Sequence, residues 1–269
     1  MLLTGLVSVT FRQKTPEEVL NCVEAADLEA IEWGGDIHVP AGNLAAARQV
    51  GNLTRARHLA IPTYGSYYRA GVLADEQKSP PFHAVLATAA ELGAGGIRVW
   101  THQVSSQKAS DDQWARTIED LARIRDLAAA KGLLIYLEYH NNTLNDRAAS
   151  TRRLLEAVDG IYTFWQPLNE LTREENIKTL TAARIRLAHL HVFSDQGSSC
   201  LLETGEQDWQ TYFGLLPEQD NLPARPDQPR CLMIEFVKDQ SEDSLLADAR
   251  TLRAWVRSRT GKISPDPGT

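Results

Sequence analysis

The sequence predicts an α/β protein, specifically a single (β/α)8 TIM barrel. Eight short apolar runs each precede a longer segment with helical periodicity, in units of about 30 residues. No linker interrupts the series, and 269 residues suit one barrel, which typically needs about 250. A doubly wound open sheet is the alternative. It is disfavoured because no glycine-rich phosphate turn follows the first apolar run.

The expected strands are runs rich in Leu, Ile, Val and aromatic residues. They cover residues 2–10, 30–35, 61–68, 96–100, 133–139, 161–166, 185–193 and 230–237. Several expected helices begin at capping signals, such as Thr15 before a proline, and Ser110 and Thr172 before acidic residues. The helices cover residues 15–28, 43–60, 79–94, 110–131, 147–158, 172–183, 208–216 and 241–259.

The barrel domain is expected to span residues 1–262, and residues 263–269, which include two prolines, to form a disordered tail. Two segments are expected to be long loops. Residues 194–207 follow the seventh strand, so they belong to the face where barrel enzymes bind substrate. Residues 217–229 contain four prolines and enter the eighth strand from the opposite face.

Composition narrows the choice of partners and compartment. The net charge of -7 and the pI of about 5.5 argue against binding to a nucleic-acid backbone. No apolar run approaches the roughly 18 residues that span a bilayer, and the start has no basic signal-peptide region. The cysteines Cys22, Cys200 and Cys231 lack metal-ligand spacing. We therefore expect a cytoplasmic protein with reduced thiols that binds neither nucleic acid nor membrane.

Two expected strands each end in a carboxylate. Glu138 closes the run Leu-Leu-Ile-Tyr-Leu-Glu, and Glu235 closes Cys-Leu-Met-Ile-Glu, while His191 lies near the end of the run between them. Burial of an unpaired carboxylate costs several kcal/mol, so such residues need a partner or a function. Carboxyl ends of barrel strands meet at one face, so these side chains are expected to face a common target. Carboxylates with one imidazole suit Mn²⁺, Mg²⁺ or Co²⁺, with Zn²⁺ as an alternative.

Other polar residues at the same strand ends are candidates for substrate binding. They are Glu32, His38, Tyr68, Arg69, Trp100, His102, His140, Asn169 and Lys238. Arg69 and Lys238 could take a phosphate or carboxylate group. Arg98 could do the same, but strand alternation is expected to point it away from the site.

Five segments, in order along nearly the whole chain, resemble the xylose isomerase-like sugar phosphate isomerase/epimerase family. They read Ile-Glu-Trp-Gly-Gly-Asp-Ile-His-Val-Pro from residue 31, Ile-Arg-Val-Trp from 97, Leu-Glu-Tyr-His from 137, His-Leu-His-Val-Phe from 189 and Ile-Glu-Phe-Val-Lys-Asp from 234. The resemblance implies a barrel with one divalent metal held by Glu, Asp, His and Glu. In this chain, Glu138, His191 and Glu235 match three of these ligands.

The resemblance implies that Gln166 replaces the aspartate ligand. An amide oxygen can still ligate a metal, but one negative charge is lost, so affinity should fall or metal preference change. The family's nearby histidine falls near Asn169. The two glutamates are implied to act as acid and base on a sugar, with an enediolate between them. A homo-oligomer is compatible with the family.

Three other functions are compatible with these residues. A lyase could expel a β-hydroxyl from the same enolate, acting on a keto-sugar or inositol-type substrate. A phosphodiesterase resembling the family's endonuclease branch is disfavoured, because it needs more His and Asp ligands and a basic groove. A non-catalytic sugar-binding barrel with a degraded metal site is the third alternative, suggested by Gln166.

Overall fold

The protein is described here by a computed structural model covering residues 2–73, 80–194 and 197–261. Eight parallel strands form a closed barrel in the order β1-β10-β7-β6-β5-β4-β3-β2. The strands are β1 Leu3–Val7, β2 Ala30–Gly34, β3 Tyr64–Ala70, β4 Gly96–Thr101, β5 Leu134–Glu138, β6 Ile161–Trp165, β7 Leu187–Val192 and β10 Cys231–Ile234. The predicted (β/α)8 barrel is confirmed. The predicted tail, 263–269, lies outside the described residues.

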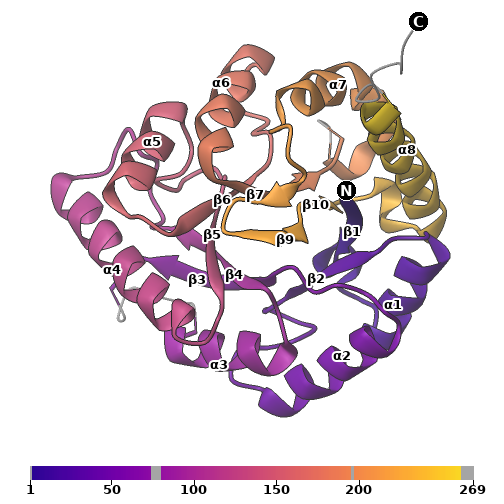
Figure 1. Ribbon diagram of the computed structural model, residues 1–269, viewed down its shortest axis with the longest axis horizontal. Helices are drawn as coiled ribbons and strands as arrows, with labels where there is room; N and C mark the ends of the chain where they lie inside the picture. The colour runs from indigo at the N-terminus through magenta and orange to yellow at the C-terminus, as the bar shows by residue number, and fades with distance from the viewer. Residues whose placement is uncertain (1, 74–79, 195–196, 262–269) are drawn as a thin grey trace, which may run out of the picture.

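Helices surround the barrel (Figure 1). They are α1 Pro16–Ala25, α2 Leu44–Ala56, α3 Phe82–Leu92, α4 Asp111–Ala129, α5 Ala148–Ala157, α6 Arg173–Ala183, α7 Glu206–Leu215 and α8 Glu242–Gly261. The predicted helix starts are confirmed at α1, α4 and α6, where Thr15, Ser110 and Thr172 form capping boxes. Each cap satisfies backbone groups that the first helical turn leaves unpaired.

Side-chain alternation divides the apolar residues into two layers. One cluster includes Ile97 and Val99 and packs strands against helices. A second cluster includes Tyr136, Phe164 and Met233 and fills the barrel interior. Because Ile97 and Val99 point outward, Arg98 between them points inward, so the expectation that it faces away from the site is wrong.

The segment 217–229 was expected to be an irregular loop, but it contains a short antiparallel hairpin. Strands β8 (Asn221–Leu222) and β9 (Arg225–Pro229) pair with each other, and β9 lies across the centre of the ring in Figure 1. The segment after β7 contains the short 3₁₀ helices Gly197–Ser199 and Leu202–Gly205. In the described parts of the chain, no helix is long and apolar enough to cross a membrane. Cys22, Cys200 and Cys231 form no disulfide bond.

Candidate functional site

Five polar side chains meet at the carboxyl ends of the barrel strands. Glu32 belongs to β2, Glu138 ends β5, Gln166 follows β6, His191 belongs to β7, and Glu235 follows β10. Each of them is at most 6% exposed. The parallel barrel brings them together because all its strands end at the same face. The sequence-based grouping of Glu138, His191 and Glu235 therefore corresponds to one cluster.

Arg98, on β4, is the buried cation of this cluster. Its Nε lies 2.7 Å from Oε1 of Glu32, and its Nη1 contacts Oε2 of Glu138. The ion pairs fit beside Gly65 because that residue has no side chain. A Cβ there would come within 2.5 Å of Glu32 Oε1 and 2.8 Å of Arg98 Nη2. A buried arginine between two carboxylates compensates their charges, which would otherwise be costly to bury.

His191 occupies the centre of the cluster. Its Nε2 lies 3.4 Å from Oε2 of Glu32. Its Nδ1 lies 2.9 Å from the amide oxygen of Gln166, 3.5 Å from Oε1 of Glu138 and 3.4 Å from Oε2 of Glu235. Burial alone would lower the pKa of His191, but Glu235, Glu32 and Glu138 outweigh it and raise the pKa to about 10. The imidazole is therefore a cation at neutral pH, and both ring nitrogens donate.

The pKa values of the two expected acid/base residues move in opposite directions. Burial favours the neutral form of both carboxyls. At Glu138 the neighbouring Arg98 and His191 charges outweigh burial and lower the pKa to about 2. At Glu235 burial, reinforced by the negative charge of Glu138, raises the pKa. One carboxyl is therefore firmly ionised, while the other holds a proton more readily.

The side chains around His191 offer the carboxylate, amide and imidazole donors that a divalent cation binds. Gln166 Nε2 donates to the carbonyl oxygen of Tyr139 at 2.7 Å, which turns the amide oxygen toward His191 Nδ1. The other histidine nitrogen faces the Glu32 carboxylate, an arrangement that usually orients metal-binding histidines. Donor types and orientation thus fit a metal ion, which would have to displace the His191 proton.

The net charge and the spacing of the same side chains are less favourable for metal binding than their donor types. Within the described residues, no group of three or more His, Cys, Asp and Glu side chains has the arrangement of a metal site. Arg98 already compensates part of the negative charge on Glu138, and Gln166 contributes none. Metal binding at these donors is therefore a proposal to be tested by titration.

Aromatic and basic side chains form one wall beside Glu138. Trp100 Nε1 donates to Glu138 Oε2. The Arg69 guanidinium lies 4.2 Å from the centre of the Trp100 ring, and the His140 ring lies 5.0 Å from it. Arg69 Nη1 also donates to the backbone oxygen of His102 at 3.0 Å. These four expected substrate-binding residues are thus brought together near the cluster.

Four other expected substrate-binding residues have different surroundings. Tyr68 donates to Asp120 on α4 and packs against Phe82 on α3, so its hydroxyl points toward the helices. His38, in the loop after β2, contacts Ser8 Oγ at 3.0 Å and Lys14 O at 3.2 Å, so it packs against the segment between β1 and α1. Asn169 lines a hollow between α6 and α7. Lys238 is half-buried at the start of the 3₁₀ helix Lys238–Gln240, three residues beyond Glu235.

Sequence reasoning underestimated Arg98, and a signal for it was present. Trp100 was expected at the site, and Arg98 lies two residues earlier on the same strand. Because side chains on a strand alternate with period two, both must point to the same side of the barrel. Applied consistently to β4, this rule would have placed Arg98 at the site.

Comparisons with known proteins agree with this architecture. The family model described as "Xylose isomerase-like TIM barrel" matches residues 20–224. L-ribulose 3-epimerase aligns over 100% of both chains, with a TM-score of 0.71 and 17% identity. A probable 3-DHS dehydratase from Bacillus anthracis aligns over 94% of this chain and 99% of its own, with a TM-score of 0.66 and 18% identity.

A third solved structure is a xylose isomerase-like TIM barrel protein from Mycobacterium smegmatis in complex with magnesium. It aligns over 96% of this chain and 98% of its own, with a TM-score of 0.65 and 12% identity. Comparison with curated proteins gave no match. At identities this low, the structural likenesses establish the shared fold.

Proposed function

Since the chain belongs to the xylose isomerase-like TIM barrel family, we infer that it is an isomerase or epimerase of a sugar or sugar derivative. The reaction would proceed through an enediolate, with Glu138 and Glu235 as the acid/base pair. The observation that carries this proposal is their shared position. Both carboxylates lie within 3.5 Å of His191 Nδ1, and they come from β5 and β10, which β6 and β7 separate in the barrel.

Glu138 and Glu235 are suited to different steps of the reaction, one removing a proton and the other returning one. Divergent pKa values in one site commonly separate an acid from a base. Glu235 has the raised pKa, so it is the better group to take a proton from carbon and hold it. Glu138 is fixed by Arg98 and Trp100 through Oε2, which leaves Oε1 facing the site. In an epimerisation, Glu138 would serve the opposite face of the substrate carbon.

Arg98 and His191 supply the positive charge that an enediolate needs. Both are buried, so their charges act in a medium of low effective dielectric. With no metal bound, His191 Nδ1–H would donate to a substrate oxygen placed among Gln166, Glu138 and Glu235. A bound metal would replace this proton, and its charge would then take the place of the imidazolium charge. Trp100 and His140 would form an apolar wall, and Arg69 lies beside them.

A divalent cation is the proposed cofactor. Mn²⁺, Mg²⁺ or Co²⁺, with Zn²⁺ as an alternative, would be held by Glu138, Gln166, His191 and Glu235 and would act as a Lewis acid on the carbonyl and its neighbouring hydroxyl. The magnesium complex of the Mycobacterium smegmatis protein supports this choice by analogy. The sugar substrate would be a small molecule.

The experiment is product analysis by NMR with a panel of ketoses and sugar acids, with and without each metal. Isomerisation or inversion of at least one sugar is the expected result. Loss of water instead would assign the lyase alternative, which the fold shared with a probable dehydratase keeps in view. Saturable sugar binding without any conversion, with every metal tested, would contradict the proposal and favour a binding barrel.

A further inference from the structure

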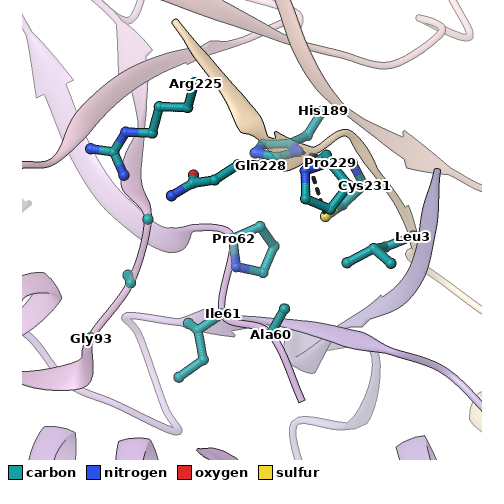
Figure 2. A pocket seen from close by; sticks show the side chains of 12 residues that line it. Leu3, Ala60, Ile61, Pro62, Gly93, His189, Arg225, Gln228, Pro229 and Cys231 are labelled. Carbon is teal, nitrogen blue, oxygen red and sulfur yellow. Dashed lines mark hydrogen bonds between the residues drawn. The ribbon is translucent and has the colours of Figure 1, made fainter. Parts of the chain in front are cut away.

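A cavity of about 260 Å³ lies at the amino ends of the barrel strands, opposite the glutamate cluster (Figure 2). The first residues of β1 and β10, the segments before β3 and β4, and hairpin β8–β9 enclose it. Its lining includes Leu3, Pro62, His189, Arg225, Gln228 and Cys231. The hairpin that was missed in the sequence thus forms one wall of a cavity.

The cavity is lined by basic and neutral groups. Arg225 and Gln228 project from the hairpin side, and His189 comes from β7 (Figure 2). Arg225 Nη2 donates to the backbone oxygen of Gly132 at the edge of the cavity, so an anion would engage the other nitrogens of this guanidinium. None of the lining residues in the described chain is Asp or Glu. A second arginine, Arg230, is 1% exposed and directly precedes the lining residue Cys231, with Asp220 near enough to compensate part of its charge. A site with these charges would attract an anion and repel a cation.

His189 provides a buried donor that faces no acceptor. Its Nδ1 accepts from the backbone N–H of Cys231 at 3.1 Å, so the hydrogen of the neutral ring belongs on Nε2. His189 is only 1% exposed, and its Nε2 has no hydrogen-bond partner among residues 2–73, 80–194 and 197–261.

Tyr136 adds a second unsatisfied group beside His189. Its ring lies 5.0 Å from that of His189, it is fully buried, and its hydroxyl finds no partner in the described part of the chain. Burial raises the pKa of this phenol, and the Arg225 charge acts in the opposite direction, which places Arg225 within electrostatic reach. An unsatisfied buried polar group destabilises the fold, so two such groups side by side indicate a missing acceptor.

We propose that this cavity binds a small oxyanion of the carboxylate or phosphate class, with Arg225 and the Nε2–H of His189 as its donors. The inference is independent of the proposed isomerase activity, because none of its residues belongs to the glutamate cluster. The hairpin residues Arg225 and Gln228 would close over the anion, and Tyr136 would donate from below.

The test is NMR of protein labelled with ¹⁵N-histidine, titrated with inorganic phosphate and, separately, acetate at constant ionic strength in chloride. A saturable shift of the His189 Nε2 resonance is expected with at least one of them. A response to phosphate alone or to acetate alone identifies the anion class. The His191 resonance, at the opposite end of the barrel, reports separately on binding at the glutamate cluster.

Two test substitutions, Arg225→Gln and Gln228→Leu, and one control, Arg152→Gln, show whether the cavity residues bind the anion. Arg225→Gln should weaken the anion response of His189 by roughly tenfold or more, because a charge-assisted hydrogen bond is lost. Arg152→Gln, which removes an exposed arginine on α5, should leave it unchanged. Gln228→Leu should also weaken the response, and it serves if Arg225→Gln fails to fold.

The proposal is overturned if His189 Nε2 responds to neither anion, which would leave an ordered water as its partner. It is also overturned if Arg225→Gln or Gln228→Leu binds as tightly as the unmodified protein. Anion binding that moves only the His191 resonance counts against the proposal as well.

Discussion

Nε2 of His191 lies 3.4 Å from Oε2 of Glu32, although their strands β7 and β2 are not neighbours in the barrel. The other oxygen of Glu32 accepts from Arg98 Nε at 2.7 Å. One carboxylate therefore fixes both the histidine and the arginine of the site. Glu32 was expected to bind substrate, and these contacts lead us to propose that it positions His191 and Arg98, which can be tested by mutation.

Glu32→Gln should lower both metal affinity and kcat/KM by roughly 10–100-fold, because carboxylate partners of metal-binding histidines contribute about that much. Calorimetric titration with Mn²⁺ and steady-state kinetics measure the two effects. The control is Glu242→Gln, which removes an exposed carboxylate paired with Lys14. Equal metal affinity in both variants would contradict the positioning role.

Arg98→Met should destabilise the fold by about 3–5 kcal/mol, because Glu32 and Glu138 would remain buried without their partner. Arg48→Met, at an exposed pair with Glu91, should cost under about 1 kcal/mol. Urea unfolding measures both losses. The double variant Arg98→Met with Glu32→Gln should recover part of the loss, and strict additivity would show that the two residues are not coupled.

Gln166→Asp should increase affinity for Mn²⁺, because it adds a negative charge where the amide oxygen faces His191. Asn169→Asp makes the same chemical change at an exposed position outside the cluster and is the matched control. Titration calorimetry compares the two variants with the unmodified protein. If Gln166→Asp binds the metal no more tightly than the control, Gln166 does not occupy a ligand position.

Asp248 should make stability depend on pH. Burial raises the pKa of this carboxyl to about 6, although it accepts from the backbone N–H of Leu202 at 2.8 Å. The folded protein thus binds the Asp248 proton more tightly than the unfolded chain. The stabilisation by this proton is complete below the ordinary value of 3.8 and is lost as pH rises through about 6.

Asp248→Asn removes that titration. The free energy of unfolding of the variant, relative to the unmodified protein, should increase by about 2–3 kcal/mol between pH 4 and pH 7. Urea unfolding at a series of pH values measures the difference. A difference that is constant across this range would show that Asp248 does not titrate there.

Local signals in the sequence determined most of the architecture correctly. Capping boxes at Thr15, Ser110 and Thr172 act within one turn, so they are visible in a short stretch of sequence. The carboxylates Glu138 and Glu235 could be grouped because the ends of barrel strands converge. These inferences required only the order of the strands and helices and the period of the apolar residues in each.

Inferences that depended on side-chain direction or long-range contacts were less successful. Arg98 was assigned the wrong side of β4, although Trp100 on the same strand already indicated the inner one. The contact between Tyr68 and Asp120 joins residues 52 positions apart, and no local pattern encodes it. The hairpin of β8 and β9 was not predicted, because Pro226 and Pro229 are typical of loops. Proline is nevertheless tolerated on an edge strand such as β9.

The most direct test of the proposed chemistry is deuterium incorporation from D₂O into a ketose, followed by NMR with a divalent metal present. The account predicts that the unmodified protein exchanges the proton on the carbon next to the carbonyl of at least one sugar. Glu235→Gln should abolish that exchange, with sugar binding retained. Exchange at an unchanged rate in Glu235→Gln would contradict the central role given to this carboxylate.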